Sequence, residues 1–172
     1  MSQVPGSYPG PMSHVVLMCG AAGAGKSTAA RELEARGLLR LSVDVDAWER
    51  GLRRMPLPDG VRQEIVADLQ RRLLEAVAAG RDVVVDLSFW SRAMREEWRA
   101  LLAPTGATVE ILHVVTDRGT ALARLRERAG AHADDFALPP GLAEQYHENF
   151  EPPEPDEGPV TVLRSDGPPT SA

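Results

Sequence analysis

The chain has 172 residues, a length that predicts one domain with a hydrophobic core of its own. Its formal net charge of −6 disfavours a general nucleic-acid-binding protein, and a hydrophobic content of 43% is ordinary for a globular chain. No apolar stretch approaches the ~20 residues that cross a membrane, and the N-terminus lacks the basic and apolar regions of a signal peptide. We therefore expect a cytoplasmic protein with no membrane partner.

The two ends of the chain are predicted to be disordered. Residues 1–13 are rich in proline and glycine, and residues 165–172 are similar, so neither segment has much apolar surface to bury. The folded domain is expected to span residues 14–164.

Apolar residues predict a buried strand at residues 14–19, and residues 27–36 show a helical pattern that ends before Gly37. The segment between them fits the pattern G-x-x-x-x-G-K-[ST] of the P-loop, whose backbone N–H groups bind phosphates. This order also puts the positive end of the helix dipole beneath the phosphates. We expect the following residues to bind the nucleotide: Gly20, Ala21, Ala22, Gly23, Ala24, Gly25, Lys26, Ser27 and Thr28.

Lys26 is the only lysine in the chain, because the other 18 of the 19 basic residues are arginine. Its compact ammonium can lie beside the β- and γ-phosphates, whereas the broad planar group of an arginine does not fit beneath the loop. The hydroxyl of Ser27 can bind Mg²⁺.

Strands and helices alternate through the rest of the chain. Strands are predicted at 38–43, 82–86, 108–115 and 160–163, and helices at 61–79, 92–102, 117–128 and 141–150. Such alternation predicts an α/β fold of three layers, in which helices cover both faces of a parallel sheet. Ligands of these sheets bind at the carboxyl ends of the strands.

Three aspartates follow strands at that edge. Asp44 comes just after the second strand, Asp46 two residues later, and Asp86 at the end of the third strand. Phosphoryl transfer needs a carboxylate to accept the proton of the attacking hydroxyl and oxygen ligands for Mg²⁺. We assign Asp44 as the base and Asp86 to the metal. An alternative role for Asp44 or Asp46, favoured for Asp46, is the N-cap of a helix from Ala47 to Arg53.

The phosphate loop, Val43-Asp44, residues 83–89 and the run 123–128 together resemble the small ATP-binding P-loop kinases related to polynucleotide kinase, zeta toxin and chloramphenicol phosphotransferase. The resemblance implies a five-stranded sheet in the order 2-3-1-4-5, an aspartate after the second strand as base, and a lid whose arginines close over ATP. Arg124 and Arg128 match this lid and share one face of the predicted helix, where they can neutralise charge on the transferred group. The alternative for this pair is a solvated helix face.

The sequence departs from the polynucleotide kinases after the base. Those enzymes tend to have an arginine there that binds the substrate's phosphate, whereas here Trp48 and Glu49 precede the first arginine, Arg50. Without this arginine, we expect the protein to bind a neutral or cationic phosphoryl acceptor more readily.

Further residues have two interpretations each. The aromatic residues Trp48, Phe89 and Trp90 can stack on a substrate or pack the core. Arg92 and Arg95 can contact phosphate or cover a helix surface, and the segment 150–153 can flank adenine or stiffen a connection.

We predict an ATP-dependent kinase that uses Mg²⁺ and phosphorylates a hydroxyl of a small molecule, such as an antibiotic or a metabolite. A monomer or a weak homodimer without a nucleic-acid partner is expected. A GTPase is strongly disfavoured, because its Asn-Lys-x-Asp element needs a second lysine. The alternatives are a kinase of polynucleotide 5′-hydroxyls or of nucleotide sugars, and a non-catalytic ATP-binding module.

Overall fold

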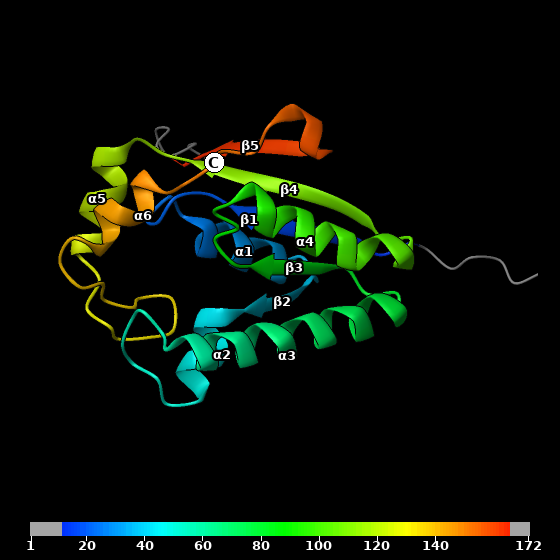
Figure 1. Cartoon of the computed structure of the whole chain (residues 1–172), viewed down its shortest axis with the longest axis horizontal. Coiled ribbons are helices and arrows are strands. Elements are labelled where there is room, and N and C mark those ends of the chain that lie inside the picture. Colours follow the sequence, from blue (N-terminus) through cyan, green and yellow to red (C-terminus); the bar gives the residue numbers. More distant parts are fainter. Residues whose placement is uncertain (1–11, 166–172) are drawn as a thin grey trace, which may run out of the picture.

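The computed structural model describes residues 12–165, so the segments 1–11 and 166–172, which we predicted to be disordered, lie outside the described residues. Strands and helices alternate as predicted (Figure 1). The strands are β1 His14–Cys19, β2 Leu39–Ser42, β3 Val83–Asp86, β4 Thr108–Val115 and β5 Val160–Arg164. The helices are α1 Lys26–Ala35, α2 Val43–Glu49, α3 Asp59–Ala78, α4 Arg92–Leu102, α5 Arg118–Arg126 and α6 Leu142–Glu148, with short 3-10 turns at Ala103–Thr105 (η1) and Pro155–Glu157 (η2).

The five strands form one sheet in the order β2-β3-β1-β4-β5, and every neighbouring pair is parallel. This confirms the predicted fold class and strand order. Because β1 lies in the middle of the sheet, the phosphate loop that follows it emerges at the centre of the sheet's carboxyl edge.

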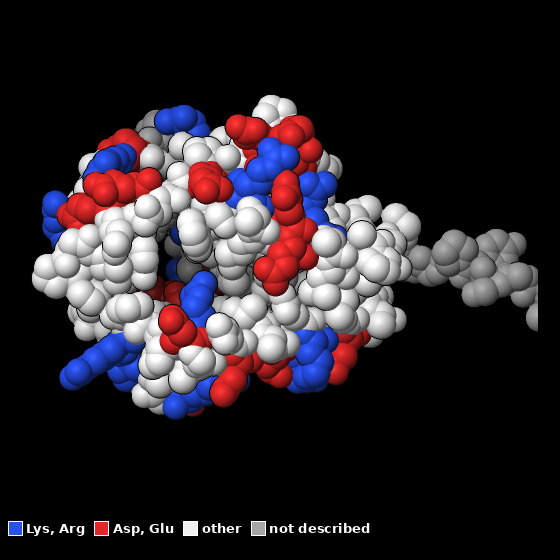
Figure 2. Space-filling model, viewed as in Figure 1, with Lys and Arg blue, Asp and Glu red and all other residues white. Residues whose placement is uncertain are grey.

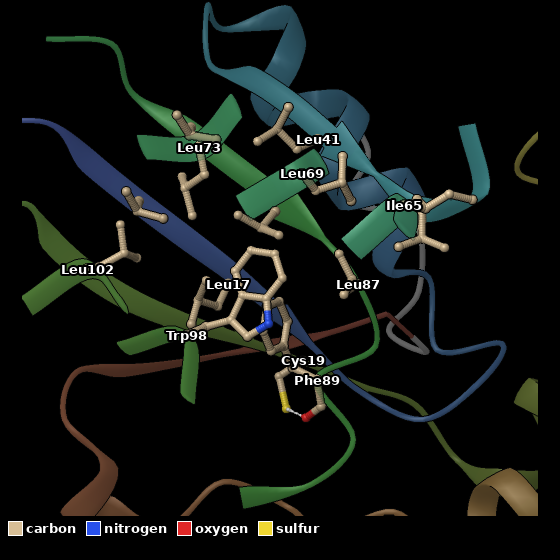
Figure 3. Packing of buried hydrophobic residues seen from close by; sticks show 14 of the residues in the cluster. Leu17, Cys19, Leu41, Ile65, Leu69, Leu73, Leu87, Phe89, Trp98 and Leu102 are labelled. Atoms are coloured by element: carbon tan, nitrogen blue, oxygen red, sulfur yellow. Dashed lines mark hydrogen bonds between the residues drawn. The ribbon is translucent and has the colours of Figure 1, made fainter. Parts of the chain in front are cut away.

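Helices cover both faces of the sheet. On one face, alternate strand residues such as Leu17 and Leu41 pack against Ile65, Leu69 and other apolar residues of α3, and against α4 (Figure 3). On the opposite face, Val16 and Val84 pack against alanines of α1. Figure 1 shows α3 and α4 on the near face, and α5 and α6 beyond the carboxyl ends of the strands.

Two boundaries differ from the prediction in ways that affect the site. Helix α2 follows β2 directly, because the hydroxyl of Ser42 accepts a hydrogen bond from the N–H of Val45 and caps the helix. Helix α5 ends at Arg126, two residues earlier than expected.

Two residues from the predicted disordered ends are well packed. The hydroxyl of Ser13 is buried and donates to the carbonyl of Val77, while Ser165 bonds to the phosphate loop. Within residues 12–165, no helix is both long and apolar enough to span a membrane.

Candidate active site

The phosphate loop is held in close contact with the neighbouring elements. A Cβ atom at Gly23, where φ is 78°, would lie 2.4 Å from the carbonyl oxygen of Ala121 on α5. A Cβ atom at Gly20 would lie 2.6 Å from the carbonyl oxygen of Val114 on β4. Only glycine allows these approaches, so the glycines fix the path of the loop.

Helix α1 begins at Lys26 with no side-chain cap, since its N-cap is Gly25 at φ 100°. The N–H groups of its first turn therefore have no partner within the helix. Unpaired N–H groups and the helix dipole fit the phosphates of a nucleotide.

The ammonium of Lys26 donates to the carbonyl oxygen of Ala21 at 2.9 Å, which folds the side chain back over the loop. Burial lowers the pKa of Lys26 to about 8, although the nearby carboxylates of Asp86 and Asp44 act to raise it. An anion bound beside Lys26 would favour its charged form, as expected for a phosphate ligand.

A single cavity of about 520 Å³ joins the residues that the sequence analysis selected. Figure 2 shows that the molecule is hollowed near the carboxyl edge of the sheet, with atoms of basic and acidic residues inside the hollow. The selected residues that line the cavity are Gly20, Ala21, Ala22, Gly23, Gly25, Lys26, Ser27, Thr28, Asp44, Asp86, Arg124 and Arg128. Ala24 does not line it, because its side chain is buried beneath the loop.

Asp44 lies in the first turn of α2 and faces the cavity. Burial raises the pKa of Asp44 to about 6, and the charge of Asp86 adds to this effect, whereas the charge of Arg128 opposes it. A carboxylate with a pKa near 6 is a stronger base than an ordinary aspartate and is still mostly ionised at neutral pH.

Asp46 does not cap α2, contrary to the favoured interpretation. It lies inside the helix and is buried, and both of its carboxylate oxygens accept hydrogen bonds from Nη1 of Arg72 at 2.9 and 3.2 Å. The cap is Ser42 instead, so Asp46 connects α2 to α3.

Asp86 is buried at the end of β3, where its Oδ2 accepts hydrogen bonds from Nε and Nη2 of Arg40 at 3.0 and 2.6 Å. Ser27, which has a hydroxyl group, also lines the cavity. Hydroxyl and carboxylate oxygens are the ligands that Mg²⁺ prefers, so the residues present fit this ion. The assignment of Ser27 and Asp86 to the metal remains a prediction.

Arg124 and Arg128 both line the cavity. The prediction that they share one helix face is wrong, because α5 ends at Arg126 and Arg128 lies beyond it. The Arg124 guanidinium donates to the carbonyl oxygen of Gly23 at 3.3 Å and to that of Ser165 at 3.0 Å. The Arg128 guanidinium has no hydrogen bond or ion pair within residues 12–165. Arg124 therefore supports the phosphate loop, whereas Arg128 is available to a ligand.

The segment that follows α5, residues 129–135, is anchored by two aspartates. The side chain of Asp134 accepts from Nη2 of Arg40 at 2.7 Å and from Nη1 of Arg31 at 2.5 Å. Asp135 accepts from the N–H groups of Ala129 and Ala131. The partners of Asp134 come from α1 and β2, and those of Asp135 lie in the segment itself.

The aromatic residues divide between the core and the cavity. Phe89 is fully buried and packs edge-on against Trp98, and Trp48 packs edge-on against Phe136. Trp90 lines the cavity and is 44% exposed. Among the three aromatics, Trp90 is thus the one available to cover a ligand.

Phe89 has a φ of 41°, in the left-handed region that costs energy for a residue with a side chain. Its carbonyl oxygen accepts from Nη1 of Arg95 at 2.9 Å and from the buried thiol of Cys19 at 3.5 Å (Figure 3). These bonds hold the turn that carries Ser88 and Trp90 along the cavity wall.

Neither Arg92 nor Arg95 contacts the cavity. Arg95 is fully buried and forms a two-point ion pair with Glu157 of η2, with distances of 2.6 and 2.8 Å. Arg92 lies on the surface and pairs with Glu96 and Asp156. Both arginines fix the turn near η2 to α4 and do not serve a phosphate.

The sequence analysis missed several residues of the site. Three of them line the cavity: Arg62 on α3, Tyr146 on α6 and Phe136. His147 on α6 is not a lining residue, but its Nε2 bonds to the carbonyl oxygen of Ala22 at 2.8 Å, which ties α6 to the phosphate loop. Phe150, from the segment expected either to flank adenine or to stiffen a connection, lines the cavity and lies tilted against His113.

Comparison with known proteins gives one family and several similar structures. The family model described as AAA domain (AAA_33) matches residues 15–153. No curated protein matches the chain. A sugar kinase from Janibacter sp. HTCC2649 is 27% identical with a TM-score of 0.64, and the match covers 92% of this chain and 88% of that one.

Two other similar structures share the fold at lower identity. A gluconokinase from Sinorhizobium meliloti 1021 is 24% identical with a TM-score of 0.60, over 91% of this chain and 85% of that one. The APS kinase of Mycobacterium tuberculosis, in complex with AMPPNP and APS, is 19% identical with a TM-score of 0.58, over 92% of this chain and 91% of that one.

Proposed function

The chain belongs to the AAA domain family AAA_33, and from this premise we propose that it is an ATP-dependent kinase that phosphorylates a hydroxyl of a small molecule. The observation that carries the proposal is the convergence of Lys26 and Asp44 on one cavity. Phosphoryl transfer to a hydroxyl needs groups that hold the phosphates and a carboxylate that orients the hydroxyl and accepts its proton, and Lys26 and Asp44 are suited to these two roles.

The N–H groups of the phosphate loop and the ammonium of Lys26 would hold the phosphates of ATP. Ser27 and Asp86 would hold Mg²⁺, which when bound neutralises charge on the phosphates. Asp44 would orient the acceptor hydroxyl and accept its proton, and Arg128 would compensate the charge on the transferred group.

An acceptor with several hydroxyls is favoured by the similar structures, since one is described as a sugar kinase and another as a gluconokinase. The small cavity also suits such a molecule better than a polynucleotide, which needs a long basic groove. We therefore favour a sugar-like metabolite over an antibiotic or an oligonucleotide with a 5′-hydroxyl.

The test is ADP formation from ATP and Mg²⁺ with a panel of acceptors that includes sugars, sugar acids, hydroxylated antibiotics and a 5′-hydroxyl oligonucleotide. We expect one class of small molecule to stimulate ADP formation and to carry the phosphoryl group in the product. Asp44→Asn should abolish the stimulation. Stimulation by the oligonucleotide alone, or by no acceptor, would contradict the proposal.

A further inference from the structure

Five lysine and arginine side chains line the cavity. Two of them have no hydrogen-bond or ion-pair partner within residues 12–165. Lys26, Arg31 and Arg124 donate to protein oxygens. The guanidinium groups of Arg62 and Arg128 have no hydrogen bond or ion pair to any residue of the described range 12–165. These two cations are therefore available to a ligand.

The two unpaired arginines come from elements on different sides of the sheet's carboxyl edge: Arg62 is on α3, which packs against α2, whereas Arg128 follows α5 (Figure 1). Arg128 acts on the phosphate end, because its charge lowers the pKa values of both Lys26 and Asp44. Arg62 is not among the charges that most affect those groups. Its charge instead opposes the raised pKa of Tyr146, which results first from burial and also from the charge of Asp44. Because Asp44 is on α2, which packs against α3, Arg62 lies on the same side of the cavity as the proposed base, where the acceptor would bind.

Arg62 shares the cavity with several apolar residues. It lies in the first turns of α3, half-buried, and Figure 1 shows the start of α3 facing the loop before α6 at the end of the sheet. Met55, Leu57, Phe136 and Leu138 line the same cavity. A ligand that fills the cavity would remove this half-buried guanidinium from water, which is costly without a partner, so Arg62 is expected to pair with an anionic group of the ligand.

Building on the proposed kinase function, we propose that the acceptor carries an anionic group, a carboxylate or a phosphate, which Arg62 binds while Asp44 meets the reacting hydroxyl. A guanidinium can bind either group through two parallel hydrogen bonds, which would orient the acceptor and leave its hydroxyl free. This reverses the expectation of a neutral or cationic acceptor, because the missing arginine after Asp44 is replaced by one from α3.

Asp59 offers the competing interpretation. It lies one turn before Arg62, lines the cavity and is exposed, and it forms no ion pair with Arg62. A cationic acceptor would use Asp59, whereas an anionic acceptor would use Arg62. Acceptors that differ in one charged group therefore separate the two.

The experiment compares matched acceptors with wild type and with Arg62→Gln. The pairs are D-gluconate with D-sorbitol, and glucose 6-phosphate with glucose, and D-glucosamine provides a cationic member. Both kcat/KM and calorimetric binding, in the presence of Mg²⁺ and a non-hydrolysable ATP analogue, are measured. We expect the charged member of one anionic pair to be preferred by about tenfold or more, which is the effect of one charge-assisted pair of hydrogen bonds. The pair that shows the preference distinguishes carboxylate from phosphate.

Arg62→Gln should reduce the ratio between the charged and the neutral acceptor of that pair to about one, without changing the KM for ATP. Arg62→Lys should restore part of it, and Asp59→Asn should preserve or increase it. Arg126→Gln, on the exposed surface of α5, is the control for a general loss of positive charge.

The outcomes separate this inference from the proposed function. A charge preference in binding with no ADP formation from any acceptor would count against the kinase and support the role of Arg62. Three results would overturn the role of Arg62. The first is equal or absent binding of the acids and their neutral partners. The others are a preference for glucosamine that depends on Asp59, and a preference for the anionic acceptor that is unchanged in Arg62→Gln.

Discussion

Arg40 and Asp86 lie on neighbouring strands and on the same face of the sheet, with Nη2 of Arg40 2.6 Å from Oδ2 of Asp86. The register explains the contact, because Asp86 is aligned with Ser42, two residues beyond Arg40. The same guanidinium binds Asp134 of the segment after α5. One buried arginine therefore connects the proposed metal ligand with the lid.

Arg40→Gln is predicted to destabilise the protein strongly. The side chains of Arg40 and Asp86 are 7% and 4% exposed, so the substitution leaves buried carboxylates without their cation, at a cost of about 3 kcal/mol in the free energy of unfolding. Arg31→Gln is the control, because Arg31 is 46% exposed and its pair with Asp134 should contribute less than about 1 kcal/mol. Urea unfolding of both variants measures the difference, and equal losses would contradict this account.

The sheet and the phosphate loop could be predicted because their signals are local. Each buried strand is a short apolar run, and the P-loop pattern fixes the strand, loop and helix around it. Asp44 and Asp86 were found by their positions after strands, and both line the cavity. The N-cap was missed because Ser42 was taken as part of the second strand.

The long-range contacts could not be predicted from the sequence. Arg62 and Tyr146 reach the cavity, and His147 reaches the phosphate loop, only through the packing of α3 and α6, and nothing in the neighbouring sequence indicates it. Arg40 did give a signal, since an arginine inside a short apolar strand needs a buried anion. Its partner Asp134, however, is 94 residues away.

Lys26→Arg is predicted to impair the enzyme although it preserves the charge. The Lys26 ammonium is half-buried against the loop and donates to the carbonyl oxygen of Ala21, and a guanidinium would displace the loop or the phosphates. We expect a steep fall in turnover and weaker ATP binding. Calorimetry with ATP and steady-state assays of the purified variant test this, and values near those of wild type would show that the lysine is not required.

Asp44→Asn is predicted to reduce turnover, whereas Asp46→Asn is predicted to reduce stability. Asp44→Asn should leave ATP binding nearly intact and reduce turnover by about 10²–10⁴-fold, since it removes a general base. Asp46→Asn should preserve turnover and lower the free energy of unfolding by about 1 kcal/mol, since it weakens the pair with Arg72. Turnover, ATP binding and urea unfolding are measured for both variants. Loss of turnover in Asp46→Asn alone would move the base to that residue.

The acceptor kcat/KM is predicted to fall as the pH decreases through about 6. Burial raises the pKa of Asp44 to that value, and only its deprotonated form can accept the hydroxyl proton, so activity is present above this pH and lost below it. Arg128→Ala should move the midpoint to higher pH, because the charge of Arg128 lowers the pKa of Asp44. Asp134→Asn should move it to lower pH, because the charge of Asp134 raises that pKa. Unmoved pH profiles in both variants would exclude Asp44 as the titrating group.

The two lid arginines are predicted to have different roles. Arg128 has no partner among the described residues and should meet the transferred phosphoryl group, so Arg128→Ala should reduce turnover by about 10²-fold with little loss of ATP affinity. Arg124 supports the carbonyl of Gly23, so Arg124→Ala should weaken ATP binding first. Arg126→Ala, on the exposed surface of α5, should be mild. Steady-state kinetics and ATP binding of the three variants separate these effects.

The motion of the lid can be tested by hydrogen exchange. Because Asp134 is anchored by Arg40 and Arg31, residues 129–135 should be partly protected in the free protein and become more protected with a non-hydrolysable ATP analogue, as Arg128 approaches the phosphates. Asp134→Asn should remove the protection of the free state, because it weakens both anchors, and should retain the response to the analogue. Protection confined to the phosphate loop, with no change over residues 128–135, would show that this segment does not close over the nucleotide.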